Sequence, residues 1–183
     1  MGFGMFRLFL AATALLLLPV VVVVGGAWIM STVSGRQTVN DQKPLNQRLG
    51  YDTKAVERYW GALDPPARRA EQRFLELDLV FPVFYGTALA VSLLTASAML
   101  GGRVHATWLI APVGVTVVAD WAENLVQLDQ LRNYIEAGEK GLAPGWINVA
   151  STATAVKLLF FSISSLALLA LLVTLILRAR TAQ

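Results

Sequence analysis

Five polar residues inside one apolar stretch are the strongest candidates for chemistry in this sequence. The stretch, residues 108–127, has the length and character of a helix that crosses a bilayer. At 3.6 residues per turn its polar side chains share one face, and they are Thr116, Asp120, Glu123, Asn124 and Gln127. A carboxylate inside a span costs about 2.5–3.5 kcal/mol on insertion scales, and more when it faces lipid unpaired. We therefore expect this face to point at other helices or at water.

A second set of polar residues is expected to meet this face. Lys157 lies about ten residues into the last predicted helix. If consecutive spans alternate in direction, the acidic residues and this lysine gather near one membrane face, on the side of segment 31–76, with Tyr85 beneath them. The predicted polar pocket consists of Asp78, Tyr85, Asp120, Glu123, Asn124, Thr154 and Lys157.

Two interpretations of this pocket stay open. Lys157 could pair with Asp120 or Glu123 and simply hold two helices together, because interhelical polar contacts in membranes contribute about 0.6 kcal/mol on average. Three carboxylates facing one ammonium are, however, more negative charge than such a contact needs. Ionisable residues inside a membrane are candidates for function, so the alternative is a site for a ligand, an ion or a proton.

The composition is that of an integral membrane protein. Of 183 residues, 56% are hydrophobic and 15% are charged, and the mean hydropathy is +0.58. A soluble domain of this size is seldom so apolar. The net charge is +3 with no basic tract, which argues against nucleic acid as a partner. With no cysteine and one histidine, we predict no metal site and no cofactor.

Four apolar runs approach the roughly 20 residues that a helix needs to cross a bilayer. We place them at about 8–30, 77–100, 105–127 and 150–177, in one membrane domain covering 1–183. The predicted fold is therefore all-α, a four-transmembrane-helix bundle with up-down-up-down order. Pro19 is expected to kink the first run. We expect this run to be a retained span, because its apolar core is long for a signal peptide.

The polar segment 31–76 is expected to contain a short amphipathic helix. Val56, Tyr59, Trp60 and Leu63 follow helical spacing, and an Asp-Thr pair before them can cap the helix. Tyr and Trp suit the headgroup level of a membrane, so we predict an interfacial helix on the membrane surface. The alternative is that this helix packs on the ends of the spans.

A single helix is predicted from about 65 to 100. Asp64 is a good N-cap and Pro65 suits the first helical position. Pro82 should bend this helix where it enters the membrane. The aromatic residues near the start of its span are expected to serve packing more often than substrate binding, and they are Phe74, Phe81, Phe84 and Tyr85.

The orientation signals conflict. Arg7, Arg103, Arg178 and Arg180 fall on one side with no acid among them, which is typical of a cytoplasmic face. Counting lysine and arginine alone, the side of segment 31–76 carries more. We predict a bacterial inner-membrane protein with both termini cytoplasmic, so that the polar pocket opens outward.

Part of the sequence resembles small four-span bacterial integral membrane proteins. The pattern covers about residues 49–127 and is carried by Asp78, Phe81-Pro82, Tyr85, Pro112, Asp120, Glu123 and Asn124. The resemblance implies the four-span fold and the choice of site residues. It implies no activity.

Three classes of function stay open. No catalytic motif is visible, so we favour a non-enzymatic membrane protein, either an accessory subunit of a membrane complex or a binder of lipid or a small ligand. The first alternative is a membrane-embedded enzyme on a lipid-like substrate, with Asp120 or Glu123 as general acid or base and Lys157 as the electrostatic partner. The second is a proton-coupled transporter or channel. The expected partners are the lipid bilayer and other membrane subunits or further copies of this chain.

Overall fold

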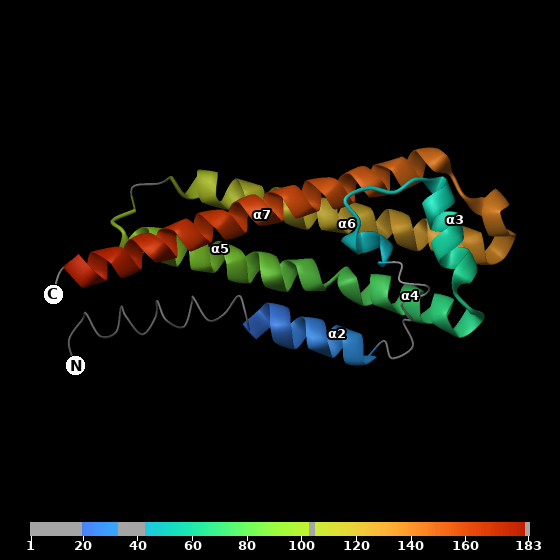
Figure 1. Cartoon of the computed structure of the whole chain (residues 1–183), viewed down its shortest axis with the longest axis horizontal. Coiled ribbons are helices and arrows are strands. Elements are labelled where there is room, and N and C mark those ends of the chain that lie inside the picture. The colour runs from blue at the N-terminus through green and yellow to red at the C-terminus, as the bar shows by residue number, and fades with distance from the viewer. Residues whose placement is uncertain (1–19, 33–42, 103–104, 182–183) are drawn as a thin grey trace.

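The computed structural model is all-helical (Figure 1) and describes residues 20–32, 43–102 and 105–181. The predicted all-α class is thus confirmed for the described chain. Its elements, in order, are η1 (Val21–Gly25), α2 (Gly26–Thr32), η2 (Leu45–Gln47), α3 (Thr53–Ala62), α4 (Pro65–Asp78), α5 (Phe81–Met99), α6 (Ala106–Ala137), η3 (Gly138–Gly141) and α7 (Pro144–Thr181). The first half of the predicted span 8–30, residues 8–19 with Pro19, lies outside the described residues.

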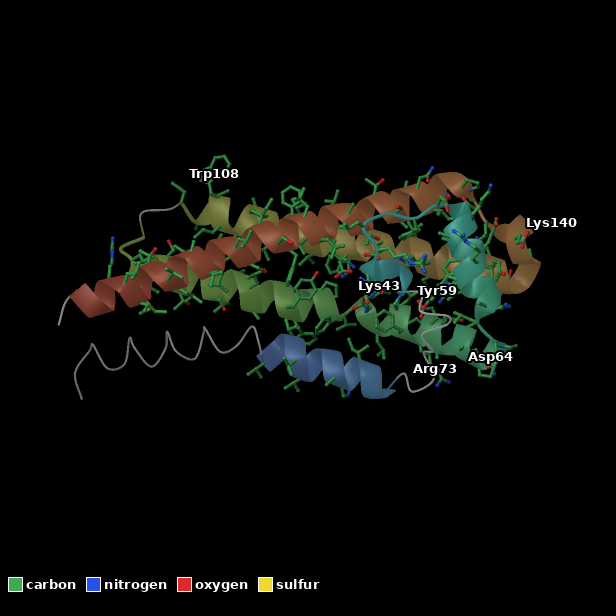
Figure 2. All side chains as sticks on the ribbon, in the orientation of Figure 1. Lys43, Tyr59, Asp64, Arg73, Trp108 and Lys140 are labelled. Carbon is green, nitrogen blue, oxygen red and sulfur yellow. The ribbon has the colours of Figure 1, made fainter. Side chains whose placement is uncertain are left out.

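Three stretches in the described chain are long and apolar enough to cross a membrane. They cover Pro65–Met99, Ala106–Gly141 and Pro144–Arg178. Figure 1 shows α5, α6 and α7 lying side by side in alternate directions, with η1 beside α5 and α2 beside α4. In Figure 2, Trp108 lies towards one end of this bundle, whereas Lys43, Asp64, Arg73 and Lys140 lie towards the end that carries α3.

Helix ends follow the capping residues of the sequence. The Asp64 carboxylate accepts a hydrogen bond from the Ala67 N–H at 2.8 Å, and Asp52 caps α3 in the same way. At its C-terminal end α6 stops at Gly138, whose φ of +62° lies in the left-handed region that favours glycine. These local signals fix where α3, α4 and α6 begin or end.

The prediction of one helix over about 65–100 agrees with the observed extent of the span, but the helix is divided at its middle. The segment forms two helices, α4 and α5, which are separated at Leu79 and Val80. Pro82 has no N–H to donate to the carbonyl of Asp78, and a proline ring clashes with the carbonyl four residues earlier. The proline therefore interrupts the helix where we expected a bend.

Helix α3 packs on protein, so its predicted position on the membrane surface is wrong. Its apolar face, formed by Val56, Tyr59 and Trp60, is almost fully buried, each residue being 1% exposed. This face joins a core cluster that also contains residues of α4, α6 and α7, among them Leu75, Leu131 and Ile147. The alternative, packing on the ends of the long helices, is the arrangement observed (Figure 1).

A second core cluster holds the other half of the bundle together. Leu89 and Leu93 of α5 pack there with Val113 of α6 and Leu168 of α7. Nearby, α5 and α6 approach closely at Gly86, where an added Cβ would lie 2.5 Å from a methyl group of Val117. The polar site described next lies between these two clusters along α6.

Candidate functional site

The polar face of α6 points into the protein, as its spacing predicted. All five members are buried, with at most 4% of their surface exposed, and they are Thr116, Asp120, Glu123, Asn124 and Gln127. We call this set the α6 polar face. A helix segment in an apolar stretch that turns every polar residue inward leaves its other faces free for lipid.

Lys157 of α7 joins two carboxylates of the α6 polar face. Its Nζ donates to Oδ1 of Asp120 at 3.0 Å and also forms an ion pair with Oε2 of Glu123. Tyr85 of α5 donates its hydroxyl to the other oxygen of Asp120 at 2.7 Å. Asp120 therefore links three helices through charged and phenolic donors, the stronger kind of hydrogen bond.

The backbone carbonyls at the α4–α5 break are bonded by two α6 side chains. Asn124 Nδ2 donates to the carbonyl of Asp78 at 3.1 Å and also lies 3.2 Å from the Asp78 carboxylate. Trp121 Nε1 donates to the carbonyl of Leu79 at 2.8 Å. A broken helix at membrane depth is tolerated only where protein or a water-lined cavity satisfies the freed backbone groups. Trp121 and Asn124 donate hydrogen bonds to the two carbonyls freed at this break.

The network continues from Glu123 towards the α3 end. Gln127 Nε2 donates to Glu123 at 3.0 Å and to the hydroxyl of Tyr51 at 2.9 Å. The N–H of Tyr51 donates in turn to the Ser151 hydroxyl of α7. Burial raises the pKa of Tyr51, which lies outside the long helices, to about 12, so this phenol stays protonated at neutral pH.

Thr154 and the amide oxygen of Asn124 are the remaining polar groups of the predicted pocket. Thr154, which is fully buried, donates to the carbonyl of Ala150 in its own helix at 3.0 Å. Asn124 Oδ1 is buried without a hydrogen-bond partner among the described residues. An acceptor left in this way is costly unless water or another donor reaches it.

Four of the predicted site residues line one cavity of about 500 Å³, and they are Asp78, Tyr85, Asp120 and Lys157. Glu123, Asn124 and Thr154 are close to these residues but are not part of the cavity wall. We call this space the Asp120 cavity. Its wall also includes Val22 of η1, Gly26 and Ile29 of α2, and Gln47 of η2. Of these wall residues, the apolar Val22 and the polar Gln47 are both exposed.

Aromatic rings form another part of the cavity wall. Tyr85 meets Phe81 at a centroid distance of 5.5 Å and Phe161 at 5.8 Å, both edge to face, and Phe74 also lines the space. Phe84, by contrast, is 58% exposed. Phe161 and the wall residues of the first segment were missed from sequence, because apolar residues in an apolar span carry no signal of their own.

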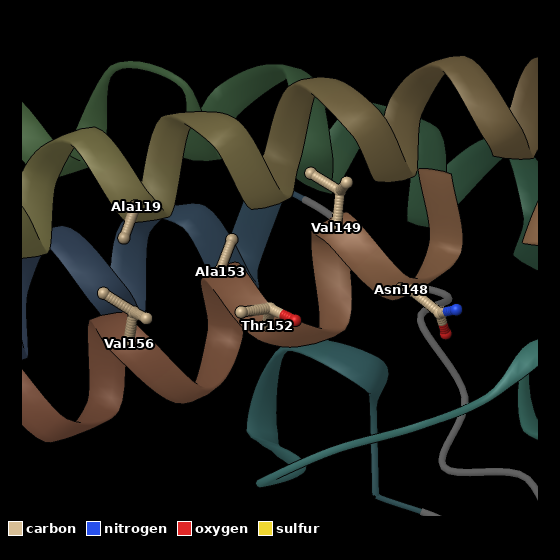
Figure 3. A pocket seen from close by; sticks show the side chains of 6 residues that line it. All are labelled: Ala119, Asn148, Val149, Thr152, Ala153 and Val156. Carbon is tan, nitrogen blue, oxygen red and sulfur yellow. The ribbon is translucent and has the colours of Figure 1, made fainter. Parts of the chain in front are cut away.

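A shallower hollow of about 410 Å³ lies on the outside of α6 and α7 (Figure 3). Ala119, Val149, Ala153 and Val156 form its apolar surface, and Asn148 and Thr152 its polar edge. It contains no charged residue, so it is not a candidate for the same chemistry.

In the described part of the chain, no group of three histidine, aspartate or glutamate residues is placed to bind a metal ion. Searches of known protein families, curated proteins and solved structures give no match to this sequence. Function must therefore be argued from the site itself.

Proposed function

We propose that this chain is an integral membrane protein with four spans. The three long apolar helices supply three of them. The fourth is the predicted run 8–30, whose described end continues as helix beside α4 and α5. Helix α7 exposes large apolar side chains along its length, including Leu159, Leu166, Leu169 and Leu177, and such a surface suits lipid better than water.

We further propose the orientation predicted from sequence, with both termini in the cytoplasm of a bacterium and the α3 end outside. Arg178, one of the four basic residues on the opposite side, is exposed at the far end of α7, whereas Arg7 and Arg103 lie outside the described residues. The assignment to a bacterium rests on the resemblance of about residues 49–127 to small four-span bacterial membrane proteins.

The proposed function is non-enzymatic: the protein binds a small amphiphilic ligand within the membrane, alone or as an accessory subunit of a complex. The observation that carries this proposal is the Asp120 cavity. A lysine and two carboxylates that only held helices together would be enclosed by packed side chains. Here Lys157 and Asp120 border about 500 Å³ of space that also has apolar walls, the combination typical of a ligand pocket.

Filling the cavity tests ligand binding. Gly26 lines the space, and a Cβ added there meets nothing within 4 Å, so Gly26→Leu should occupy it without disturbing the fold. Gly114→Leu is the matched control, because Gly114 is an equally open helical glycine on the exposed surface of α6. We expect mass spectrometry of the purified protein to find a co-purified amphiphile with wild type and the control, and at least tenfold less with Gly26→Leu. Equal amounts in all three would contradict the proposal.

The absence of native cysteine allows a clean test of orientation. A single cysteine at exposed Lys140 should react with a membrane-impermeant maleimide added to intact cells. One at His105, which is exposed at the other end of the bundle, should react only after the membrane is opened. The reverse pattern would show that the orientation is inverted, and equal labelling of both positions would contradict the four-span arrangement.

A further inference from the structure

We propose that the Asp120 cavity and a second, apolar cavity together form one site for a bilayer lipid with a long hydrocarbon chain. This inference rests on the proposed function and adds the class of the ligand and the place of its tail. The polar head and the adjoining part of the chain lie in the Asp120 cavity, and the rest of the chain lies in the apolar cavity.

The apolar cavity has a volume of about 630 Å³ and lies between the first helical segment and the region of the α4–α5 break. Val21 and Val24 of η1 contribute to its lining, as do Leu77 of α4, Val80 at the break and Phe84 of α5. Every lining residue is apolar or a glycine. We call this space the tail cavity.

The tail cavity adjoins the Asp120 cavity, because Ile29 and Phe81 line both spaces. The first helical segment approaches the Phe81 ring closely at Gly25, where an added Cβ would lie 2.7 Å from a ring carbon. The same ring packs edge to face on Tyr85, whose hydroxyl donates to Asp120. A polar head held near Asp120 therefore has the tail cavity directly beyond Phe81.

The lining of the tail cavity favours a hydrocarbon chain over water. A water molecule in a cavity needs two to four polar partners, which apolar side chains do not supply. Apolar walls instead gain dispersion contacts from the atoms that fill the space between them. A flexible hydrocarbon chain can provide these contacts throughout an irregular space of this kind.

The surroundings of the tail cavity supply such a chain. Two of its lining residues, Val24 and Phe84, are 61% and 58% exposed, and both belong to segments that we propose to cross the bilayer. An occupant of this space is therefore in contact with bilayer lipid. Polar and apolar cavities that adjoin in this way match a lipid, which joins a polar head to an apolar chain.

Two lipids with the same uncharged head test the role of the chain. Purified full-length protein in detergent is titrated with monopalmitoylglycerol and with monooctanoylglycerol, and bound lipid is counted by native mass spectrometry. We expect wild type to bind the long-chain lipid at least tenfold more tightly than the short-chain lipid.

Variants connect this preference to the tail cavity. Val24→Trp and Val80→Trp each add a large side chain to its lining, and neither residue lines the Asp120 cavity. Each variant should reduce the ratio of the two affinities about tenfold and bind the short-chain lipid as wild type does. Val23→Trp is the matched control, because Val23 is 67% exposed on the same segment and lines neither cavity. Val80→Trp keeps the test meaningful if Val24→Trp does not fold.

The place of the chain end can be measured separately. A palmitoyl lipid with a diazirine at the end of its chain should cross-link to Val21 and Leu77, which line the tail cavity but not the Asp120 cavity. Cross-links found only outside the tail cavity would contradict the inference.

The outcomes separate the two levels of the argument. If both lining variants keep the wild-type ratio of affinities and Gly26→Leu abolishes binding, the tail inference is overturned and the proposed function stands. If native mass spectrometry finds a dimer that both lining variants dissociate, a second copy covers this face, and the tail inference is again overturned. If Gly26→Leu binds both lipids as wild type does, the proposed function fails, and the inference fails with it.

Discussion

The indole N–H of Trp121 donates to the backbone carbonyl of Leu79 at 2.8 Å and so connects helix α6 to the break between α4 and α5. Three residues further along α6, Asn124 bonds the carbonyl of Asp78. Residues three apart on a helix share a face, so one face of α6 satisfies both freed carbonyls. The break is thus part of the helix packing, and it brings Asp78 to the wall of the Asp120 cavity.

Trp121→Phe should destabilise the protein modestly by removing this hydrogen bond while keeping most of the ring. A neutral hydrogen bond contributes about 0.5–1.5 kcal/mol, so we expect a loss near 1 kcal/mol in the free energy of unfolding. Denaturant titration in detergent measures it. Trp108→Phe serves as control, since Trp108 is 78% exposed at the other end of the bundle. If the two variants lose the same stability, Trp121 does not hold the break.

Gly86→Ala should destabilise the contact between α5 and α6. The new Cβ would lie 2.5 Å from a methyl group of Val117, and a β-branched side chain in a helix has few rotamers into which it can move. Overpacking of this kind costs about 1–3 kcal/mol. The double variant Gly86→Ala, Val117→Ala should regain most of the loss in a thermal unfolding assay.

Gly114→Ala provides the matched comparison for that experiment. Gly114 is also a helical glycine, but nothing lies within 4 Å of an added Cβ, and alanine is the better helix former by about 0.8–1.0 kcal/mol. We expect no change or a small gain in stability. A loss as large as that of Gly86→Ala would show that the close approach at Val117 is not the cause.

Lys157→Met should be strongly destabilising because it leaves Asp120 and Glu123 buried without a cation. Removing one partner of a buried ion pair costs about 3–5 kcal/mol. Adding Asp120→Asn and Glu123→Gln to the same chain should recover most of that loss, since no uncompensated charge remains. Lys140→Met, at an exposed lysine, should change stability by less than about 0.5 kcal/mol. A thermal unfolding midpoint for Lys157→Met equal to that of wild type would contradict the observed pairing.

Stability should fall above pH 10 through Tyr51. Its pKa is raised from 10.0 to about 12 in the folded protein, so the folded state binds the phenolic proton more tightly than the unfolded state does. The resulting stabilisation is complete below pH 10 and is lost as the pH rises towards 12; at pH 11 about 1.4 kcal/mol is lost. Tyr51→Phe should show a shallower decrease between pH 9 and 11 in thermal unfolding, and an unchanged slope would contradict the assignment.

The α6 polar face could be predicted from sequence because helical spacing places all its residues on one side of the helix. Polar residues at Thr116, Asp120 and Glu123 in an apolar helix must turn inward, and they do. Lys157 followed from the same reasoning, since a cation at that depth needs an acid. Periodicity and the cost of buried charge are local properties, and local properties can be read along a chain.

The break and the position of α3 could not be predicted in this way. Whether Pro82 bends or interrupts a helix depends on donors that reach the freed carbonyls, and here they come from residues 42 and 46 positions away. The apolar face around Tyr59 and Trp60 would suit headgroups or a protein core equally well. Tertiary packing decided both, and it also created the cavity whose wall includes Phe161.

Contact between a bound amphiphile and the wall of the Asp120 cavity tests the central claim most directly. Full-length protein is incubated with a phospholipid whose acyl chain carries a photoactivatable diazirine, and cross-linked residues are identified by mass spectrometry. We predict cross-links at Leu158 and Phe161, which line the cavity, that disappear in Gly26→Leu and persist in Gly114→Leu. Cross-links that are absent from the cavity wall in wild type, or unchanged in Gly26→Leu, would contradict binding of an amphiphile in the Asp120 cavity.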